Sequence, residues 1–214
     1  MKRSSFSRPI RTHVRPLQPK IAIASEGKCT EPKYFNDIRL HLQASQTDVV
    51  LVPHAGTDPL SIVEAMVIYL STNGKHWQSK DQAWAVFDGE EHWQNAQAKN
   101  RWIEAIQLAH KHKIRLAISN PSFELWYLLH FQPQAADLNR DAAVAKLKAH
   151  VLDYDKSASL FPMLHPKVGK NLTSDAIPRA AALCGQCSAT GWEQWRNPST
   201  GVGELVSILL SLAQ

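Results

Sequence analysis

Apolar residues occur along this chain as short runs separated by segments with helical spacing. Four runs have the length and composition of buried strands, at residues 20–25, 48–53, 83–87 and 114–119. The segments between them predict three helices, at residues 31–44, from residue 59 onward and at residues 93–112. This alternation of strand and helix is typical of an α/β fold in which a parallel sheet carries helices on both faces.

Helix start signals support the first two helices. Thr30 and Asp58 stand at N-cap positions, where a side-chain oxygen accepts a bond from the first turn. Pro32 and Pro59 follow in the first turns, where a missing N–H leaves no helical bond unmade.

The pattern after residue 122 is helical. Residues 123–131 are apolar almost all round, which predicts a helix inside the core rather than aromatic side chains that stack on bases. Residues 141–152 and 174–184 predict two amphipathic helices. We therefore expect one domain over residues 19–214, with an α/β core at 20–131 and a helical C-terminal extension at 132–214.

Composition limits the class of protein. With 214 residues and 44% apolar content, the chain can bury one full core. Its apolar runs are shorter than the ~18 residues that suggest a membrane helix, and residues 1–20 lack the apolar segment of a secretory signal. Three cysteines make no disulfide framework, and Cys184 and Cys187 lack the further ligands of a zinc site. We expect a cytoplasmic protein without membrane association.

Positive charge is concentrated at the N-terminus. Six of the 24 lysine and arginine residues, and none of the 19 acidic residues, lie within residues 1–20. Prolines interrupt this segment, so we expect residues 1–18 to form a basic tail without regular structure. Two interpretations of this tail are open. It could attract nucleic-acid phosphates, or it could be a solvated leader without a partner.

Acidic residues follow three of the predicted strands. Glu26 follows the first, Asp88 and Glu90 follow the third, and Glu124 lies shortly after the fourth. Carboxyl ends of parallel strands meet at one edge of a sheet, where clustered carboxylates repel one another unless a cation lies between them. Oxygen ligands of this type suit Mg²⁺ or Mn²⁺. The alternative for Glu90 and Glu91 is that they open the next helix.

Polar and basic residues near these acids are candidates for phosphate binding. Lys28 follows Glu26 closely, and Asn120 is placed to orient a water or ligand beside Glu124. A basic cluster outside the tail is formed by Lys156, Lys167 and Lys170. Solvated lysines, and a buried ion pair between Glu124 and a lysine or arginine, are the structural alternatives.

Four passages together resemble the RloB-like family, which belongs to the topoisomerase-primase (Toprim) group of folds. They are EGKCTEPKYF at residues 26–35, VFDGEEH at 86–92, ISNPSFELWYLLHF at 118–131 and NPST at 197–200. The resemblance implies a Toprim-like parallel sheet flanked by helices. It also implies that Glu26 is a general acid/base or metal ligand, and that Asp88 and Glu90 hold Mg²⁺. Glu90 stands where the usual Toprim pattern has aspartate.

RloB-like proteins are encoded beside restriction-modification and phage-defence systems, and related Toprim effectors are nucleases. The resemblance therefore implies a divalent-metal-dependent nuclease acting on DNA or RNA in phage defence and abortive infection. Its catalytic residues would be Glu26, Asp88, Glu90 and Glu124, and a sensor or ATPase partner would be encoded nearby. The alternatives are a non-catalytic Toprim-like module that binds nucleic acid or protein, and a phosphatase or nucleotidyl-transfer enzyme.

Overall fold

The computed structural model describes residues 19–42, 48–53, 56, 58–89, 95–185 and 195–212. The expected basic tail, Glu90, Glu91 and Cys187 lie outside these residues.

Five strands of the described chain form one sheet, in the order β2-β1-β3-β4-β5. They are β1 (Lys20–Ser25), β2 (Asp48–Leu51), β3 (Gln82–Asp88), β4 (Arg115–Asn120) and β5 (Ser199–Thr200). The first four are parallel, as the sequence predicts, and β5 is antiparallel to β4. The sequence does not reveal β5 because two residues are too few to show a strand pattern.

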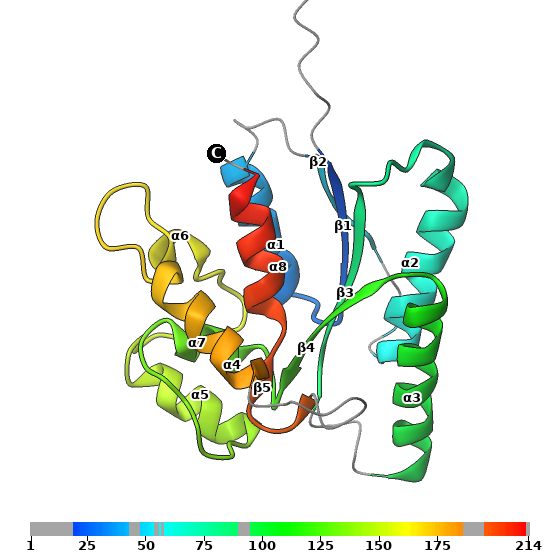
Figure 1. Cartoon of the computed structure of the whole chain (residues 1–214). Coiled ribbons are helices and arrows are strands. Elements are labelled where there is room, and N and C mark those ends of the chain that lie inside the picture. The colour runs from blue at the N-terminus through cyan, green and yellow to red at the C-terminus, as the bar shows by residue number, and fades with distance from the viewer. Residues whose placement is uncertain are drawn as a thin grey trace, which may run out of the picture.

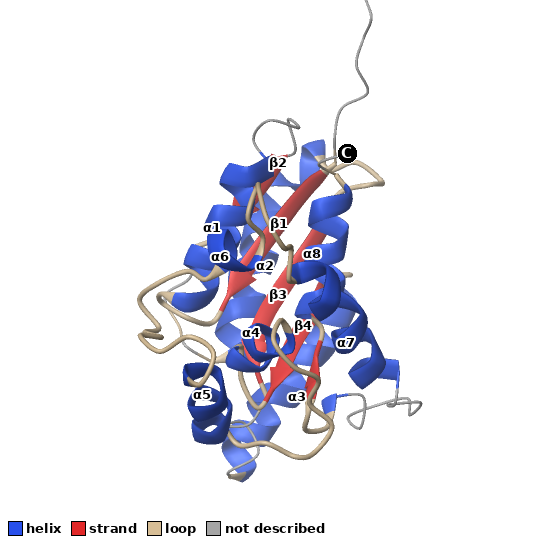
Figure 2. Ribbon diagram, turned by 90° about the vertical axis from the view of Figure 1, so that its left-hand side faces the viewer, coloured by secondary structure: helices blue, strands red, loops and turns tan. Residues whose placement is uncertain are grey.

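Helices cover both faces of the sheet (Figure 1). One face is covered by α2 (Pro59–Asn73), which leads into the 3-10 turn η2 (Gly74–His76), and by α3 (Ala96–Lys111). Against the other face lie α1 (Thr30–Leu42) and α8 (Val202–Ser211). On this same side lie α4 (Glu124–Leu129) and, from the extension, α5 (Arg140–Lys148), α6 (Phe161–Leu164) and α7 (Thr173–Gly185). Figure 2 shows α4 and α5 near the end of the sheet where β4 ends.

One of the two predicted N-caps is confirmed. Asp58 adopts extended backbone geometry and its side chain accepts a bond from the Ser61 N–H. The prediction for Thr30 is wrong, because α1 begins at Thr30 itself. Its hydroxyl instead donates to the Lys156 carbonyl at 3.1 Å and so ties α1 to the loop before α6.

Alternate residues of each strand pack into the two apolar layers. On β1, Ile21 and Ile23 join the core beside α1 and α8, while Ala22 and Ala24 join the core beside α2 and α3. Every residue of α4 is buried, which confirms the predicted core helix. The Trp126 indole donates to the Tyr34 hydroxyl at 2.9 Å inside this core, so Trp126 packs there and does not stack on bases.

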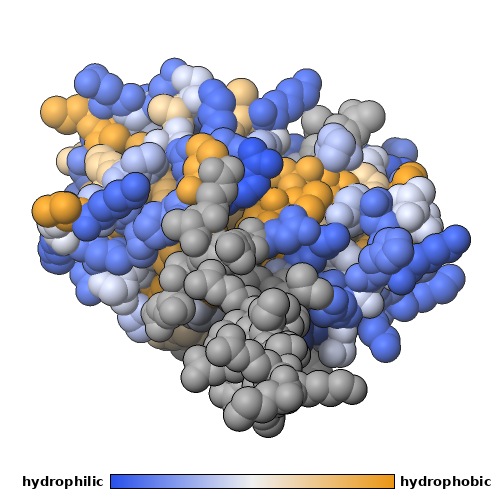
Figure 3. All heavy atoms as spheres, turned by 90° about the horizontal axis from the view of Figure 1, so that it is seen from above, coloured by the Kyte–Doolittle hydropathy of each residue, from blue (hydrophilic) through white to orange (hydrophobic). Residues whose placement is uncertain are grey.

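Polar residues make up most of the described surface seen in Figure 3, and hydrophobic residues form smaller areas. The large exposed hydrophobic side chains belong to separate segments, namely Leu40, Ile68, Leu152, Met163 and Val168. Scattered residues of this kind are ordinary on a folded protein. Within the described residues, no helix has both the length and the apolar character needed to cross a membrane.

His130, which follows α4, makes the stability of the fold depend on pH. Its Nδ1–H donates to the Trp126 carbonyl at 2.9 Å, and burial lowers its pKa from 6.5 to about 4. His130 therefore binds a proton below pH 6.5 in the unfolded chain, but only below about pH 4 in the folded chain. Stability from this group is fully present above pH 6.5 and declines as the pH falls toward 4.

We expect His130 to account for a loss of about 2 kcal/mol between pH 7 and pH 5. Urea unfolding at the two pH values measures the loss in wild type and in His130→Gln, which keeps a donor but does not titrate. The variant should lose less stability than wild type over this interval. An equal loss in both proteins would show that His130 does not set the pH dependence.

Candidate functional site

Two predicted site residues lie side by side where β1 and β3 end. Glu26 directly follows β1, Asp88 is the last residue of β3, and the strands pair in register at Ser25 and Val86. The Asp88 backbone N–H donates to Glu26 Oε2 at 2.9 Å, so the Glu26 side chain reaches across to β3. The parallel sheet therefore brings these carboxylates together, as the positions after the strands indicate.

Both carboxylate oxygens of Asp88 accept hydrogen bonds. The Phe123 backbone N–H donates to Oδ1 at 2.9 Å, and Arg140 Nη2 donates to Oδ2 at 2.8 Å. The side chains of Asp88 and Arg140 are only 14% and 27% exposed, so water screens this ion pair weakly. Arg140 begins α5, and the pair therefore joins the helical extension to the sheet.

Glu124 lies at the start of α4 and is held by three neighbours. Ser122 Oγ donates to its Oε2 at 2.6 Å, Tyr154 Oη donates to Oε1 at 3.1 Å, and Lys156 Nζ lies 3.1 Å from Oε1. Burial raises the pKa of Glu124, but the Ser122 hydroxyl, Lys156 and a backbone bond together lower it below its ordinary value. Glu124 is thus a buried, ionised carboxylate that pairs with the exposed Lys156, so an ion pair with a lysine, which the sequence left open, does form.

Glu31, in the first turn of α1, is a fourth acid that the sequence interpretation missed. It is buried, and burial followed by the charges of Glu26 and Glu124 raises its pKa to about 7. Its carboxylate lies against Gly27, where an added Cβ would be 1.7 Å from Glu31 Oε2. Glycine at residue 27 therefore leaves the space that the Glu31 carboxylate occupies.

These residues surround one pocket of about 300 Å³ at the ends of β1 and β3. Its lining contains Glu26, Gly27, Lys28, Cys29, Thr30, Glu31, Asp88, Phe123, Glu124, Arg140 and Lys156. Four carboxylates and three cationic side chains thus share a small space. Such a mixture of charges can bind a cation and the phosphate group that the cation contacts.

Burial and neighbouring acids make two carboxylates of this pocket, Asp88 and Glu31, hard to ionise. The pKa of Asp88 is raised well above its ordinary value, first by burial and then by the charges of Glu31 and Glu26, while Arg140 opposes the shift. A cation bound beside these carboxylates would favour their ionised forms. The electrostatics of the pocket therefore favour positive charge.

The structure describes two of the three predicted metal ligands. Glu26 and Asp88 lie together, whereas Glu90 lies outside the described residues. Among the residues that the structure does describe, no three histidine, cysteine, aspartate or glutamate side chains are placed to hold a metal ion. The donor chemistry of Glu26 and Asp88 still fits Mg²⁺ or Mn²⁺, since both ions prefer carboxylate oxygens.

Two of the five predicted phosphate-binding residues, Lys28 and Lys156, line the pocket. Lys167 and Lys170 do not, because they lie in the exposed loop after α6, where Lys170 is 3.8 Å from Asp175. The expected cluster of three lysines therefore does not form at this pocket. Asn120 is also absent from the lining, because its side-chain amide donates to the Trp195 carbonyl at 2.8 Å.

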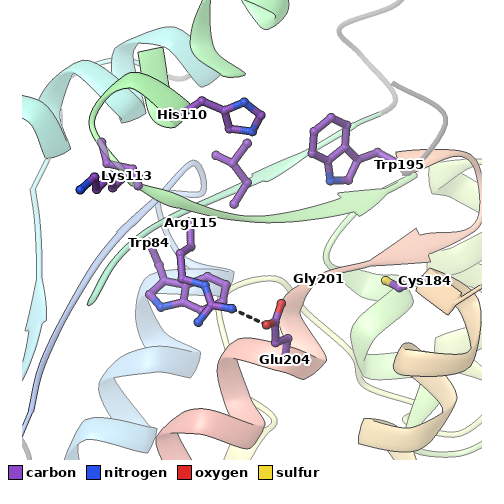
Figure 4. A pocket seen from close by; sticks show the side chains of 10 residues that line it. Trp84, His110, Lys113, Arg115, Cys184, Trp195, Gly201 and Glu204 are labelled. Carbon is purple, nitrogen blue, oxygen red and sulfur yellow. Dashed lines mark hydrogen bonds and ion pairs between the residues drawn. The ribbon is translucent and has the colours of Figure 1, made fainter. Parts of the chain in front are cut away.

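A second pocket, of about 560 Å³, lies beside the first residues of β4 (Figure 4). Its Arg115 stacks on the Trp84 ring, 4.4 Å from the centroid, and forms an ion pair with Glu204. The sulfur of Cys184, which also lines it, donates to the Thr200 carbonyl at 3.3 Å. Since Arg115 already has an acidic partner and the predicted acids lie elsewhere, we take the smaller pocket as the candidate site.

The fold and the acids at the strand ends define an α/β protein with a Toprim-like sheet. A model of the family described as RloB-like protein matches residues 21–209, and the chain belongs to this family. Searches of curated proteins and of solved structures found no match.

Replacing Gly27 with alanine tests the packing of Glu31. We expect Gly27→Ala to lower the free energy of unfolding by about 1–3 kcal/mol, because the new Cβ displaces a buried carboxylate. Gly74→Ala is the matched control, since nothing lies within 4 Å of its added Cβ, and it should change stability by less than about 0.5 kcal/mol. Urea unfolding measures both variants.

A double-mutant cycle identifies the cause. Glu31→Ala removes the obstructing carboxylate, so combining it with Gly27→Ala should cost less than the two single changes added together. Additive costs would mean that Gly27 is not needed to accommodate Glu31.

Proposed function

We propose that this protein is a divalent-metal-dependent nuclease whose active site is the pocket at the ends of β1 and β3. The observation that supports this proposal is the convergence of Glu26, Asp88 and Glu124 with Lys28 and Lys156 in one small pocket. Phosphodiester hydrolysis needs both kinds of charge, because acids hold the metal while cations offset the charge of the phosphate.

Mg²⁺ or Mn²⁺ held by Glu26, Asp88 and Glu90 would supply Lewis-acid polarisation of the phosphoryl group. Asp88 is suited to such a role because the Phe123 N–H fixes one of its oxygens at 2.9 Å. Glu26 lies beside it and is the candidate to accept a proton from the attacking water or to bind the metal. Addition of this water to phosphorus, with loss of the ester oxygen, cuts the strand.

The cationic residues are assigned to the phosphate. Lys28 lines the pocket from the segment after β1, and Lys156 lines it from the loop before α6. Lys156 pairs with Glu124, but its side chain is half-exposed, so a polynucleotide would reach it from solvent. The basic residues within 1–20 would add sequence-independent attraction to DNA or RNA.

The biological setting of this proposal is phage defence and abortive infection, with a sensor or ATPase partner encoded nearby. It rests on membership of the RloB-like family and on the resemblance to Toprim effectors. Activity would then depend on release by the partner, so the test below includes the native neighbouring genes.

A non-catalytic module that binds nucleic acid is the second candidate. It is favoured by the ion pair between Arg140 and Asp88, in which the proposed metal ligand already has a cationic partner. In such a module the pocket would bind phosphate without cutting the chain.

Substitution of the two strand-end acids separates these functions. Glu26→Gln keeps the shape of the side chain but removes its charge and basicity, so cleavage should fall by about 10²-fold or more. Asp88→Ala should reduce cleavage at least as much, because it removes a metal ligand. The assay measures growth arrest and the integrity of DNA and RNA in cells that express each variant with its native neighbours.

Asp175→Asn is the matched control, because this exposed carboxylate on α7 lies outside the pocket lining. Its cleavage should equal that of wild type. If Glu26→Gln and Asp88→Ala protect or kill cells as wild type does, the nuclease proposal is wrong. Activity of the purified protein on small phosphate esters, but not on polynucleotides, would instead indicate a phosphatase.

A further inference from the structure

Arg140 is the only arginine among the residues that line the acidic pocket in the described structure. It comes from α5, 52 residues after Asp88 along the chain, and its Nη2 donates to Asp88 Oδ2 at 2.8 Å. No sequence motif links these two residues, because the fold of the extension brings them together. The contact therefore places a guanidinium on the carboxylate that the proposed function assigns to a metal ion.

A divalent cation and the Arg140 guanidinium compete for Asp88. Both are positively charged, so they repel each other when they share one carboxylate oxygen. The two oxygens of Asp88 differ in their partners, since Oδ1 accepts the fixed Phe123 backbone N–H and Oδ2 accepts the side chain of Arg140. Loss of the guanidinium would leave the bond to Phe123 in place and Asp88 still oriented toward the pocket.

We propose that the metal ion and Arg140 exchange on Asp88, and that the released guanidinium binds a phosphate group of the polynucleotide. This inference rests on the proposed nuclease function and adds a substrate-binding residue to it. The ion pair with Asp88 is then the metal-free arrangement of the site. Metal binding frees Arg140 at the moment when the substrate needs a cationic partner.

The chemistry of arginine suits this second role. A guanidinium presents several N–H groups in a plane and can donate two parallel bonds to phosphate oxygens. Arg140 already lines the same pocket as Lys28, so its side chain can turn toward a phosphate without crossing the packed core. Its backbone is fixed at the start of α5, where the Asn139 side chain caps the helix.

A purely structural ion pair is the competing explanation. In that case Arg140 would only hold α5 against the sheet. Removing it would destabilise the extension and lower the affinities of the pocket for metal and for polynucleotide alike. The exchange predicts instead that the metal affinity rises without Arg140, because the metal then has no competitor for Asp88. Metal affinity and polynucleotide affinity should therefore change in opposite directions.

The test measures Mn²⁺ binding to the full chain by electron paramagnetic resonance of free Mn²⁺. It also measures binding of short labelled DNA and RNA with hydrolysis-resistant phosphorothioate linkages. Arg140→Gln should bind Mn²⁺ about tenfold more tightly than wild type, within the range of couplings between two ligands of one protein. In the presence of saturating Mn²⁺ it should bind the nucleic acids about tenfold more weakly.

Two further arginine variants sharpen the comparison. Arg101→Gln breaks an ion pair with Asp58, outside the pocket lining, and should change neither affinity. Arg140→Lys keeps a positive charge beside Asp88 but loses the planar fork. It should bind Mn²⁺ as wild type does and bind nucleic acid more weakly, which keeps the proposal testable if Arg140→Gln fails to fold.

The outcomes separate this inference from the function on which it rests. If Asp88→Asn abolishes Mn²⁺ binding but Arg140→Gln leaves it unchanged or weakens it, the exchange is wrong and the metal site stands. If neither wild type nor Arg140→Gln binds Mn²⁺, the proposed metal-dependent function fails and the exchange fails with it. Tighter Mn²⁺ binding by Arg140→Gln with unchanged nucleic-acid binding would overturn the phosphate-binding role.

Discussion

Carboxylates removed from water at the ends of neighbouring strands need positive partners, and the helical extension of this protein supplies them. Arg140 reaches Asp88 from α5, and Lys156 reaches Glu124 from the loop before α6. Breaking the largely buried pair of Asp88 and Arg140 by removing one partner should cost about 3–5 kcal/mol, because the remaining charge is left without compensation. The extension is therefore part of the site, and the sheet and extension depend on each other through these two contacts.

The two ion pairs differ in exposure, and this difference bears on function. Asp88 and Arg140 are both largely buried, whereas the Lys156 side chain is 54% exposed. Solvent weakens the attraction between Lys156 and Glu124, so Lys156 can contact an incoming phosphate with little loss to the fold. Arg140 cannot leave Asp88 at so little cost unless another cation takes its place beside that carboxylate. Of these two cations, one is exposed to solvent and the other is held by the proposed metal ligand.

Sequence patterns predicted the four parallel strands and the placement of Glu26, Asp88 and Glu124, because each follows from local periodicity and from the rule that sites form at strand ends. They did not identify Glu31, whose position in the first turn of α1 resembles an ordinary helix start. Arg140 gave no signal either, since it is an unremarkable first residue of an amphipathic helix. Lys167 and Lys170 do not line the pocket with Lys156, because residues that are close in sequence on either side of α6 need not be close in the fold.

The proposed function requires that the pocket at the ends of β1 and β3 binds a divalent metal through Glu26 and Asp88. Anomalous diffraction from crystals grown with Mn²⁺ tests it most directly, because the scattering locates the ion without reference to activity. We expect an anomalous peak about 2 Å from carboxylate oxygens of both residues, the ligand distance of a small divalent cation. A pocket without such a peak, with the Arg140 guanidinium still bonded to Asp88 at saturating Mn²⁺, would contradict it.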